Sequence, residues 1–402
     1  MSTANRLSQG SRRTFLQVSA MASAAMALRI ASEPTLAAAQ RMEKVFPPGA
    51  VVIDSNENPL GPCEVARKAV VDIAPQGGRY SDWMTRDFTN VFAESQALKP
   101  DYLRVYPGSS EPLHFSVLAF TSPSKSYVTA DPGYEAGMFA AKHSGARVVK
   151  VPLAKTYAHD VPAMIAAAPD AGLFYICTPN NPTGTLTPHS QIEMLVDKKP
   201  KGSVVLVDEA YIHFSDATTA IDLVKADKDV IVLRTFSKIY GLAGLRCGVA
   251  IARPDLLAKL NGLAGWSPMP ITALAAATAS LKEPRLCGER KAINATIRQR
   301  TFDWLDRNGY SYVPSSSNCF MVDTKRPAQE VIDALAARKV FIGRIWPVWP
   351  TYTRITVGTQ DEMQAFQAAF HDVMSKVKTV GFAAPLRRPA ATIDGCWPTV
   401  SS

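Results

Sequence analysis

The chain has 402 residues, enough for a large and a small domain with a core each, and its composition is that of an ordinary soluble enzyme. The net charge of +9 suits anionic cofactors and substrates, but no basic stripe with interleaved aromatic residues is present, so we expect no nucleic-acid partner. Its six cysteines show no close-pair spacing and its six histidines no ligand pattern, which disfavours a metal site.

The first 39 residues form a segment of distinct character. They hold four arginines and one glutamate, so a charge of +3 lies here and +6 in the rest of the chain. SRRTFLQ at Ser11–Gln17 precedes an alanine- and methionine-rich stretch, and Ala37 and Ala39 suit cleavage before Gln40. The segment resembles a twin-arginine signal peptide, which implies export to the periplasm by the twin-arginine translocase. A disordered basic tail or an amphipathic helix is the alternative, and the apolar run is too short for a lasting membrane span.

Short apolar runs alternate with helical stretches from about residue 127 to residue 252. Six of these runs have strand length: YVTAD, RVVKVPL, LFYICTP, SVVLVDEAY, DVIVLRTF and CGVAIA. Buried strands that alternate with helices indicate a mostly parallel sheet. The sequence therefore predicts an α/β fold, with this sheet at the centre of a large domain at residues 76–283.

A second unit follows in the C-terminal part of the chain. Helical stretches at Pro254–Leu281 and Arg285–Asn308 lead to the predicted strands SNCFMVDT, KVFIGRI and YTRITVG, which alternate with two further helices. These elements predict a smaller α+β domain at residues 284–380. Residues 381–402 are rich in proline, alanine and small polar residues and are expected to form a disordered tail.

Lys238, in the run RTFSKIYGLAGLRCG, lies thirty residues after Asp208 and eight before Arg246. Because it stands between an apolar strand and a glycine-bearing loop, we expect a buried amine with a lowered pKa rather than a surface lysine. Asp208 ends another strand, where a carboxylate can hold a ring nitrogen protonated; capping the next segment is its alternative role. An aldehyde-binding amine, such a carboxylate and a phosphate-binding arginine are the parts of a pyridoxal 5′-phosphate (PLP) site.

The phosphate of such a cofactor needs several donors. A glycine-serine turn precedes the apolar stretch PLHFSVLAF, so its backbone N–H groups would point at an anion from a helix N-terminus, although such turns are most often only caps. The hydroxyls after the strand DVIVLRTF and a nearby arginine complete the set. The candidate phosphate donors are Ser109, Ser110, Thr235, Ser237 and Arg246.

Further motifs stand in order around these residues: DSNENPLGP, GGRY, GSSE, DPGYEAG, CTPNNPTG, VDEAY and TRITVGT. With them, residues 50–378 resemble the fold-type I PLP-dependent aminotransferases, most closely the histidinol-phosphate aminotransferase-like branch. The resemblance implies that PLP forms a Schiff base with Lys238, which also moves the substrate's α-proton, and that an amino group passes between an amino acid and a 2-oxo acid. It also implies that residues 40–75 join the small domain as an N-terminal arm.

The resemblance assigns roles to several other side chains. Tyr211 and Asn181 would donate to the phenolic oxygen of PLP, although each taken alone is better explained as a core tyrosine and a turn asparagine. Tyr134 would stack on the ring, although core packing explains Tyr134 almost as well. Tyr80 would reach the phosphate from a neighbouring subunit, which implies a homodimer. Arg354, in the middle of a predicted strand, would pair with the substrate's α-carboxylate, since a buried arginine needs an anion.

The residues expected near the substrate's side chain indicate its chemical class less clearly than the residues above indicate the cofactor. Asn56 and Asn58 would lie close by, but asparagines beside a proline are usually turn residues. Arg344 stands where the resembling branch reads a phosphorylated substrate. The loop after it, WPVWP, and Trp83 favour an aromatic or apolar substrate, with packing at a proline-rich turn as an equal alternative.

Export argues against the obvious substrate, because histidinol phosphate is a cytoplasmic metabolite. The resemblance therefore carries over the reaction class and not the substrate. Two other functions stay open on the same scaffold. One is a lyase that eliminates a β-substituent such as a sulfur leaving group, or a decarboxylase, and the other is a PLP-binding protein without turnover.

Overall fold

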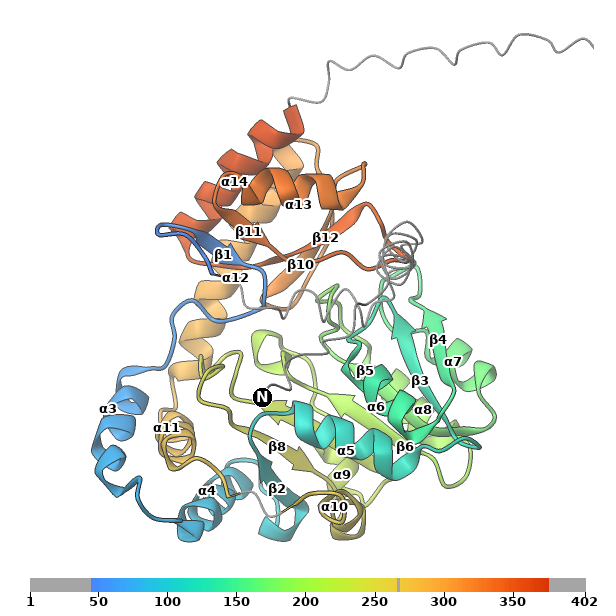
Figure 1. The fold of residues 1–402 in the computed structure, drawn as a ribbon. Coiled ribbons are helices and arrows are strands. Elements are labelled where there is room, and N and C mark those ends of the chain that lie inside the picture. The colour runs from blue at the N-terminus through green and yellow to red at the C-terminus, as the bar shows by residue number, and fades with distance from the viewer. Residues whose placement is uncertain (1–44, 266–267, 376–402) are drawn as a thin grey trace, which may run out of the picture.

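The computed structural model describes residues 45–265 and 268–375 and shows two units (Figure 1). The large unit is built on a seven-stranded sheet in the order β2-β8-β7-β6-β5-β3-β4, in which only β8 runs against the other strands. Its strands are β2 (Leu103–Tyr106), β3 (Ser126–Asp131), β4 (Val148–Pro152), β5 (Ala171–Cys177), β6 (Val204–Asp208), β7 (Val230–Thr235) and β8 (Gly248–Ile251).

The central strands of this sheet are apolar throughout their length. Every residue of β5, β6 and β7 is buried, because helices cover both faces of the sheet. The predicted α/β architecture and its six strands are confirmed, while β2, a short strand with the exposed Arg104, was not foreseen. The helices of this unit are α3 (Glu64–Ile73), α4 (Asp82–Ser95), α5 (Ser110–Phe120), α6 (Ala136–Ser144), α7 (Val161–Ala167), α8 (His189–Lys198), α9 (Ile221–Lys225), α10 (Pro254–Asn261) and α11 (Ile271–Leu281).

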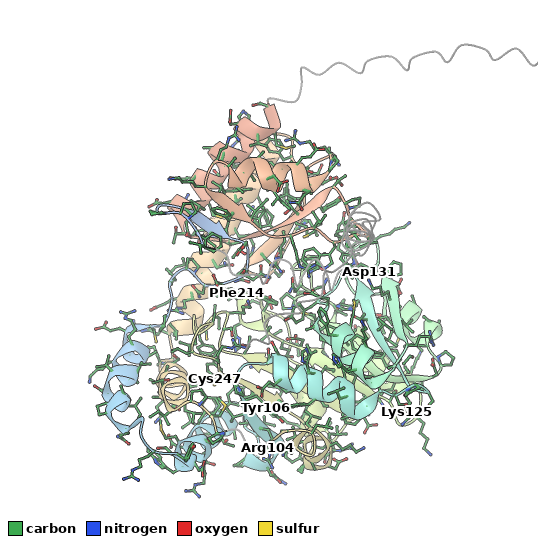
Figure 2. All side chains as sticks on the ribbon, viewed as in Figure 1. Arg104, Tyr106, Lys125, Asp131, Phe214 and Cys247 are labelled. Atoms are coloured by element: carbon green, nitrogen blue, oxygen red, sulfur yellow. The ribbon has the colours of Figure 1, made fainter. Side chains whose placement is uncertain are left out.

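The carboxyl ends of the parallel strands face the small unit. Figure 2 marks this direction on β3: Lys125 precedes the strand at its outer end, whereas Asp131, its last residue, lies on the side of the small unit. Asp208 and Thr235 end β6 and β7 on the same edge. This edge is where an open parallel sheet presents polar side chains to a ligand.

The small unit combines a three-stranded antiparallel sheet, β12-β10-β9, with a two-stranded parallel sheet, β1-β11. Buried aliphatic residues together with Phe320, Phe366 and Phe370 fill its separate core. The elements of this unit are β1 (Val51–Ile53), α12 (Leu286–Arg307), β9 (Ser311–Val313), β10 (Cys319–Asp323), α13 (Ala328–Ala336), β11 (Val340–Ile342), β12 (Tyr352–Thr356) and α14 (Gln360–Ser375).

Two segments connect the units. Helix α12 begins with Leu286 in the core of the large unit and reaches the small unit's core with Phe302 and Leu305. The expected arm at residues 40–75 is divided: β1 pairs with β11, whereas α3 packs against α11 in the large unit. Residues 54–63 therefore cross between the units. The strand β1 pairs with β11 in the small unit, whereas the amphipathic helix α3 buries its apolar face in the large unit.

Two sequence expectations concern parts of the chain that the structure does not describe. The signal-like residues 1–39 and the tail 381–402 lie outside the described residues. Within residues 45–265 and 268–375, no helix is both long and apolar enough to cross a membrane. The same ranges hold no group of three or more His, Cys, Asp and Glu side chains placed to bind a metal.

Candidate active site

A cavity of about 290 Å³ lies at the carboxyl ends of the parallel strands, between the large unit, the small unit and the crossing segment. All of the predicted site residues except Asn56, Asn58 and Tyr80 line it. The lining residues from the predicted set are Ser109, Ser110, Tyr134, Asn181, Asp208, Tyr211, Thr235, Ser237, Lys238, Arg246, Arg344 and Arg354. Residues that are far apart in sequence thus face one space.

Lys238 follows β7 and extends into this cavity. Its Nζ donates to the backbone oxygen of Ser55 at 3.2 Å and lies 5.7 Å from the centre of the Tyr211 ring. Burial, and then the charge of Arg354, lower the pKa of Lys238 from 10.5 to about 8. A substantial fraction of this amine is neutral at pH 7 to 8, which a nucleophile towards an aldehyde requires.

Asp208 ends β6 on the cavity floor with only 4% of its surface exposed. One carboxylate oxygen accepts a hydrogen bond from the Tyr175 hydroxyl at 2.9 Å, and the other accepts from the backbone N–H of Ala210 at 3.1 Å. Burial raises the pKa of Asp208 from 3.8 to about 6 despite these bonds. A cationic ring nitrogen next to this carboxylate would offset the cost of burying its charge.

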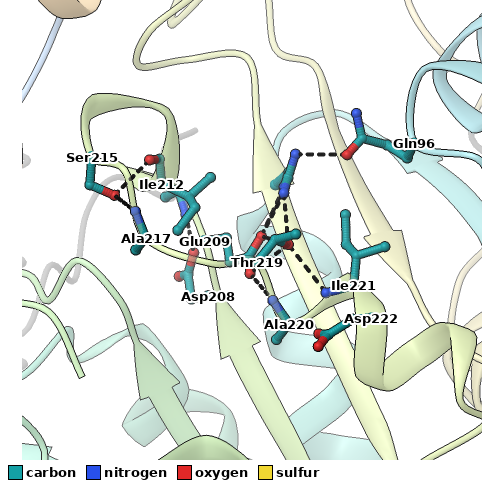
Figure 3. Close-up of polar contacts among 12 residues, drawn as sticks. Gln96, Asp208, Glu209, Ile212, Ser215, Ala217, Thr219, Ala220, Ile221 and Asp222 are labelled. Carbon is teal, nitrogen blue, oxygen red and sulfur yellow. Dashed lines mark hydrogen bonds and ion pairs between the residues drawn. The ribbon is translucent and has the colours of Figure 1, made fainter. Parts of the chain in front are cut away.

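The residue after Asp208 anchors the loop that carries Tyr211. The Glu209 carboxylate accepts from the guanidinium of Arg234 at 2.9 Å, from the Thr219 hydroxyl at 2.8 Å and from the N–H of Ala220 at 2.6 Å (Figure 3). At its other end the same guanidinium donates to Gln96. Sequence reasoning missed this buried pair; two consecutive acidic residues after a strand are the signal, because one must point away from the site.

A cluster of donors meets near the start of α5. The Ser237 hydroxyl oxygen accepts from Thr235 at 2.9 Å and from a guanidinium nitrogen of Arg246 at 3.1 Å. Gly108, with φ +93°, leaves room for that guanidinium, since a Cβ there would overlap it. Hydroxyls, a guanidinium and the first N–H groups of an eleven-residue helix therefore surround one small space. This donor set fits a phosphate group.

Arg354 reaches the cavity from the middle of β12. One terminal nitrogen donates to the side-chain oxygen of Asn181 at 2.8 Å and the other donates to the backbone oxygen of Asp54 at 2.6 Å. Its Nε is buried and has no hydrogen-bond partner among the described residues. Because buried donors are normally paired, this nitrogen is available to a ligand at the cavity, and a substrate carboxylate has the right chemistry.

Arg344 was expected to bind the phosphate of a phosphorylated substrate, but its guanidinium is already paired within the protein. It forms a buried ion pair with Glu135, and its guanidinium lies 3.9 Å from the ring centre of Trp346. Glu135 also lines the cavity and was not predicted from the sequence, although it adjoins Tyr134 in the motif DPGYEAG.

Trp346 and Trp349 do not line the cavity. Trp346 is fully buried and donates to the backbone oxygen of Gly133 at 2.9 Å, while Trp349 packs against Tyr157 and Tyr352. Neither is among the residues that line the cavity, and Trp83 is 53% exposed on α4. The proline-rich turn folds these rings against neighbouring loops, so packing explains them.

The three remaining predicted residues lie outside the cavity wall. Asn56 is buried and donates to the hydroxyl of Tyr211 at 3.0 Å, so it positions that hydroxyl. Asn58 is a turn residue, which accepts from the N–H of Leu60 and donates to the backbone oxygen of Ile239. Tyr80 is 76% exposed just before α4, and its role towards a second subunit stays a prediction.

The comparison with known families decides the assignment. Residues 49–370 match the model of the family described as aminotransferase class I and II. The chain belongs to this family. Such an aminotransferase uses PLP, and the amine, the carboxylate and the phosphate cradle of this structure fit that cofactor.

Individual relatives agree with the family. The aminotransferase is 32% identical to a histidinol-phosphate aminotransferase of Moorella thermoacetica over 81% of its own length and 86% of the relative's. It is 34% identical to an aromatic amino acid aminotransferase of Cutibacterium acnes over 74% and 85% of the two chains. A crystal structure of the histidinol-phosphate aminotransferase from Sinorhizobium meliloti with pyridoxal 5′-phosphate superposes with a TM-score of 0.77 at 26% identity, covering 84% and 97% of the chains.

Proposed function

We propose that this aminotransferase binds PLP through Lys238 and moves an amino group between an amino acid and a 2-oxo acid. The observation that carries the proposal is the convergence of three groups on one cavity: the amine of Lys238, the buried carboxylate of Asp208 and the phosphate cradle around Arg246. Each of these groups meets a different chemical requirement of the cofactor, and the fold brings them together although they are far apart in the sequence.

When bound, PLP supplies an electron sink for the charge that develops when the substrate loses its α-proton. The chain's own groups supply the rest. Lys238 would take that proton at Nζ and return it, since an amine with a pKa of about 8 exchanges protons readily near neutral pH. Asp208 would keep the ring nitrogen protonated, and Arg354 would hold the substrate's carboxylate so that the α-hydrogen faces Lys238.

The direct test is to trap the cofactor on its lysine. Borohydride reduction of the purified protein, followed by peptide mass spectrometry, should find the pyridoxyl mass on Lys238. In a separate sample that has not been reduced, an amino acid panel with a 2-oxo acid acceptor should yield the matching new amino acid. A reduced protein without that label, or without any cofactor absorption, contradicts the proposal.

The same panel separates the two other functions that the sequence leaves open. Release of pyruvate and ammonia without an acceptor, or of carbon dioxide, would indicate elimination or decarboxylation. Binding of amino acids without any product would indicate a PLP-binding protein that does not turn over. Transfer of nitrogen from a ¹⁵N-labelled donor to the acceptor supports the aminotransferase alone.

We also propose that the enzyme is a homodimer, with Tyr80 of each subunit reaching the other's phosphate site. Large apolar or aromatic side chains on the outer face of the large unit support this: Val71 on α3 is 71% exposed, and Tyr80 and Trp83 are similarly open. Sedimentation should give twice the chain mass. Tyr80→Phe should weaken PLP binding, and a monomer with unchanged PLP affinity would contradict the proposal.

Finally, we propose that residues 1–39 direct export through the twin-arginine translocase, so that the enzyme works in the periplasm. The support is the arginine pair in SRRTFLQ followed by an apolar run and small residues. Full-length protein with Arg12→Lys and Arg13→Lys should stay in the cytoplasmic fraction, whereas the unaltered chain should be found outside it. Equal distribution of both would exclude this route.

A further inference from the structure

Resting on the proposed function, we propose that Glu135 is a specificity-determining residue that excludes substrates with a second anionic group from the active site. The excluded class includes phosphorylated amino acids, dicarboxylic amino acids and dicarboxylic 2-oxo acids. The substrate class that remains has one carboxylate and a side chain without negative charge.

The first step is the position of Glu135. It follows Tyr134 directly and directly precedes α6, with 2% of its surface exposed, and it lines the same cavity as Lys238. Its carboxylate pairs with the guanidinium of Arg344, which is itself only 5% exposed. A charged pair thus forms part of the wall of a site that must receive a substrate.

The second step is that the pair is held from both units. Arg344 follows β11 in the small unit and stacks on Trp346, whose Nε1 donates to Gly133, two residues before Glu135. The loop that carries Glu135 is therefore attached to the turn that carries Arg344 by a hydrogen bond as well as by the ion pair. Swinging the guanidinium towards a ligand would break contacts on both sides.

The third step is the balance of charge in the cavity. Its cationic side chains are Lys238, Arg246, Arg344 and Arg354. In the proposed function Lys238 bonds to the cofactor, Arg246 binds its phosphate and Arg354 binds the substrate's α-carboxylate. Among the described residues that line the cavity, Arg344 alone then remains for a second anion, and Glu135 already pairs with it.

A second anion would thus meet a carboxylate instead of a cation. To reach Arg344 it would have to displace Glu135 from its partner, and a buried acid without a partner next to another anion is strongly unfavourable. A neutral side chain has no such cost. The site therefore selects through repulsion as well as through contacts.

Matched substrate pairs test the proposal. For the PLP-loaded enzyme, kcat/KM should be at least 100-fold higher for glutamine than for glutamate, for serine than for O-phosphoserine, and for pyruvate than for 2-oxoglutarate. Glu135→Gln keeps the shape and removes the charge, so it should reduce each ratio at least tenfold, mainly by lowering KM for the anionic member. Glu193→Gln on exposed α8 is the matched control and should leave the ratios unchanged.

Binding without turnover provides a second measurement. Calorimetry should show that the enzyme binds pentanoate at least tenfold more tightly than glutarate, and that Glu135→Gln removes this preference. A preference of the unaltered enzyme for the phosphorylated or dicarboxylic member, or a folded Glu135→Gln variant with unchanged ratios, would overturn the proposal. If the proposed function fails, no pair is transaminated, yet the two acids still rank by Glu135, so the two failures are distinguishable.

Discussion

Replacing the amine of Lys238 should stabilise the protein without its cofactor while slowing amino-group transfer at least a hundredfold. The native pKa of about 8 lies below the ordinary 10.5, so the folded state disfavours the protonated lysine. At 1.36 kcal/mol per pKa unit this corresponds to roughly 3 kcal/mol. For a base with a lowered native pKa, that cost is fully present below pH 8 and vanishes above pH 10.5.

Lys238→Met keeps the length of the side chain and removes the charge. At pH 7 we expect the cofactor-free variant to melt about 4 °C above the unaltered cofactor-free protein, because roughly 3 kcal/mol is spread over the unfolding entropy of some 330 ordered residues. Melting curves by circular dichroism at pH 7 and pH 10.5 measure this. At the higher pH the gain should shrink to near zero.

Lys201→Met, at an exposed turn, is the control and should melt like the unaltered protein. With PLP and an amino acid, Lys238→Met should lose at least a hundredfold in the rate of amino-group transfer, the usual contribution of a positioned proton-transfer group. A cofactor-free variant that melts at a lower temperature at pH 7, or a rise in melting temperature that persists at pH 10.5, would refute the idea that burying the charged lysine destabilises the fold.

Three further changes test other parts of the site. Asp208→Asn should raise the cofactor-free stability by roughly 3 kcal/mol at pH 8 but not at pH 3.5, because an acid whose native pKa is raised from 3.8 to about 6 loses stability as pH rises; chemical denaturation at both pH values measures it. Gly108→Ala should weaken PLP binding at least tenfold in a fluorescence titration, whereas Gly288→Ala, where a Cβ meets nothing, should not. Arg354→Lys should raise KM for the amino acid at least tenfold with little change in PLP affinity, because an ammonium cannot make the paired contact; a change confined to PLP affinity would contradict that role.

Sequence predicts the architecture well where a physical pattern is continuous. The apolar runs of β5, β6 and β7 are short and rich in branched residues, which favours buried strands, and the polar residues at their ends mark the ligand-binding edge. Lys238, Asp208 and the phosphate donors follow from these ends because each carries a distinct chemical requirement. The edge strand β2 was missed because four residues with one exposed arginine give no clear periodicity.

Contacts between side chains that are far apart in the sequence cannot be predicted from local sequence patterns. Arg344 stands at a position typical of anion recognition, but nothing local reveals that Glu135, 209 residues earlier, neutralises it. Asn56 reads as a turn residue and yet supports Tyr211 across 155 residues. Trp346 reads as a possible substrate surface and is instead buried beside two guanidiniums. In each case the side chain's partner, rather than its own type, decides its role.

The two perturbed groups of the site also explain why cofactor binding and folding should be coupled. Without the cofactor, the fold bears the cost of a charged Lys238 below about pH 8 and of a charged Asp208 above about pH 6. Both costs therefore act together between these values. One ligand relieves both, because an aldehyde bonds to the amine in its neutral form and a cationic ring nitrogen compensates the carboxylate. Binding to the native state alone stabilises it by mass action, so the stabilisation by PLP should be largest near neutral pH, where the empty site is most strained.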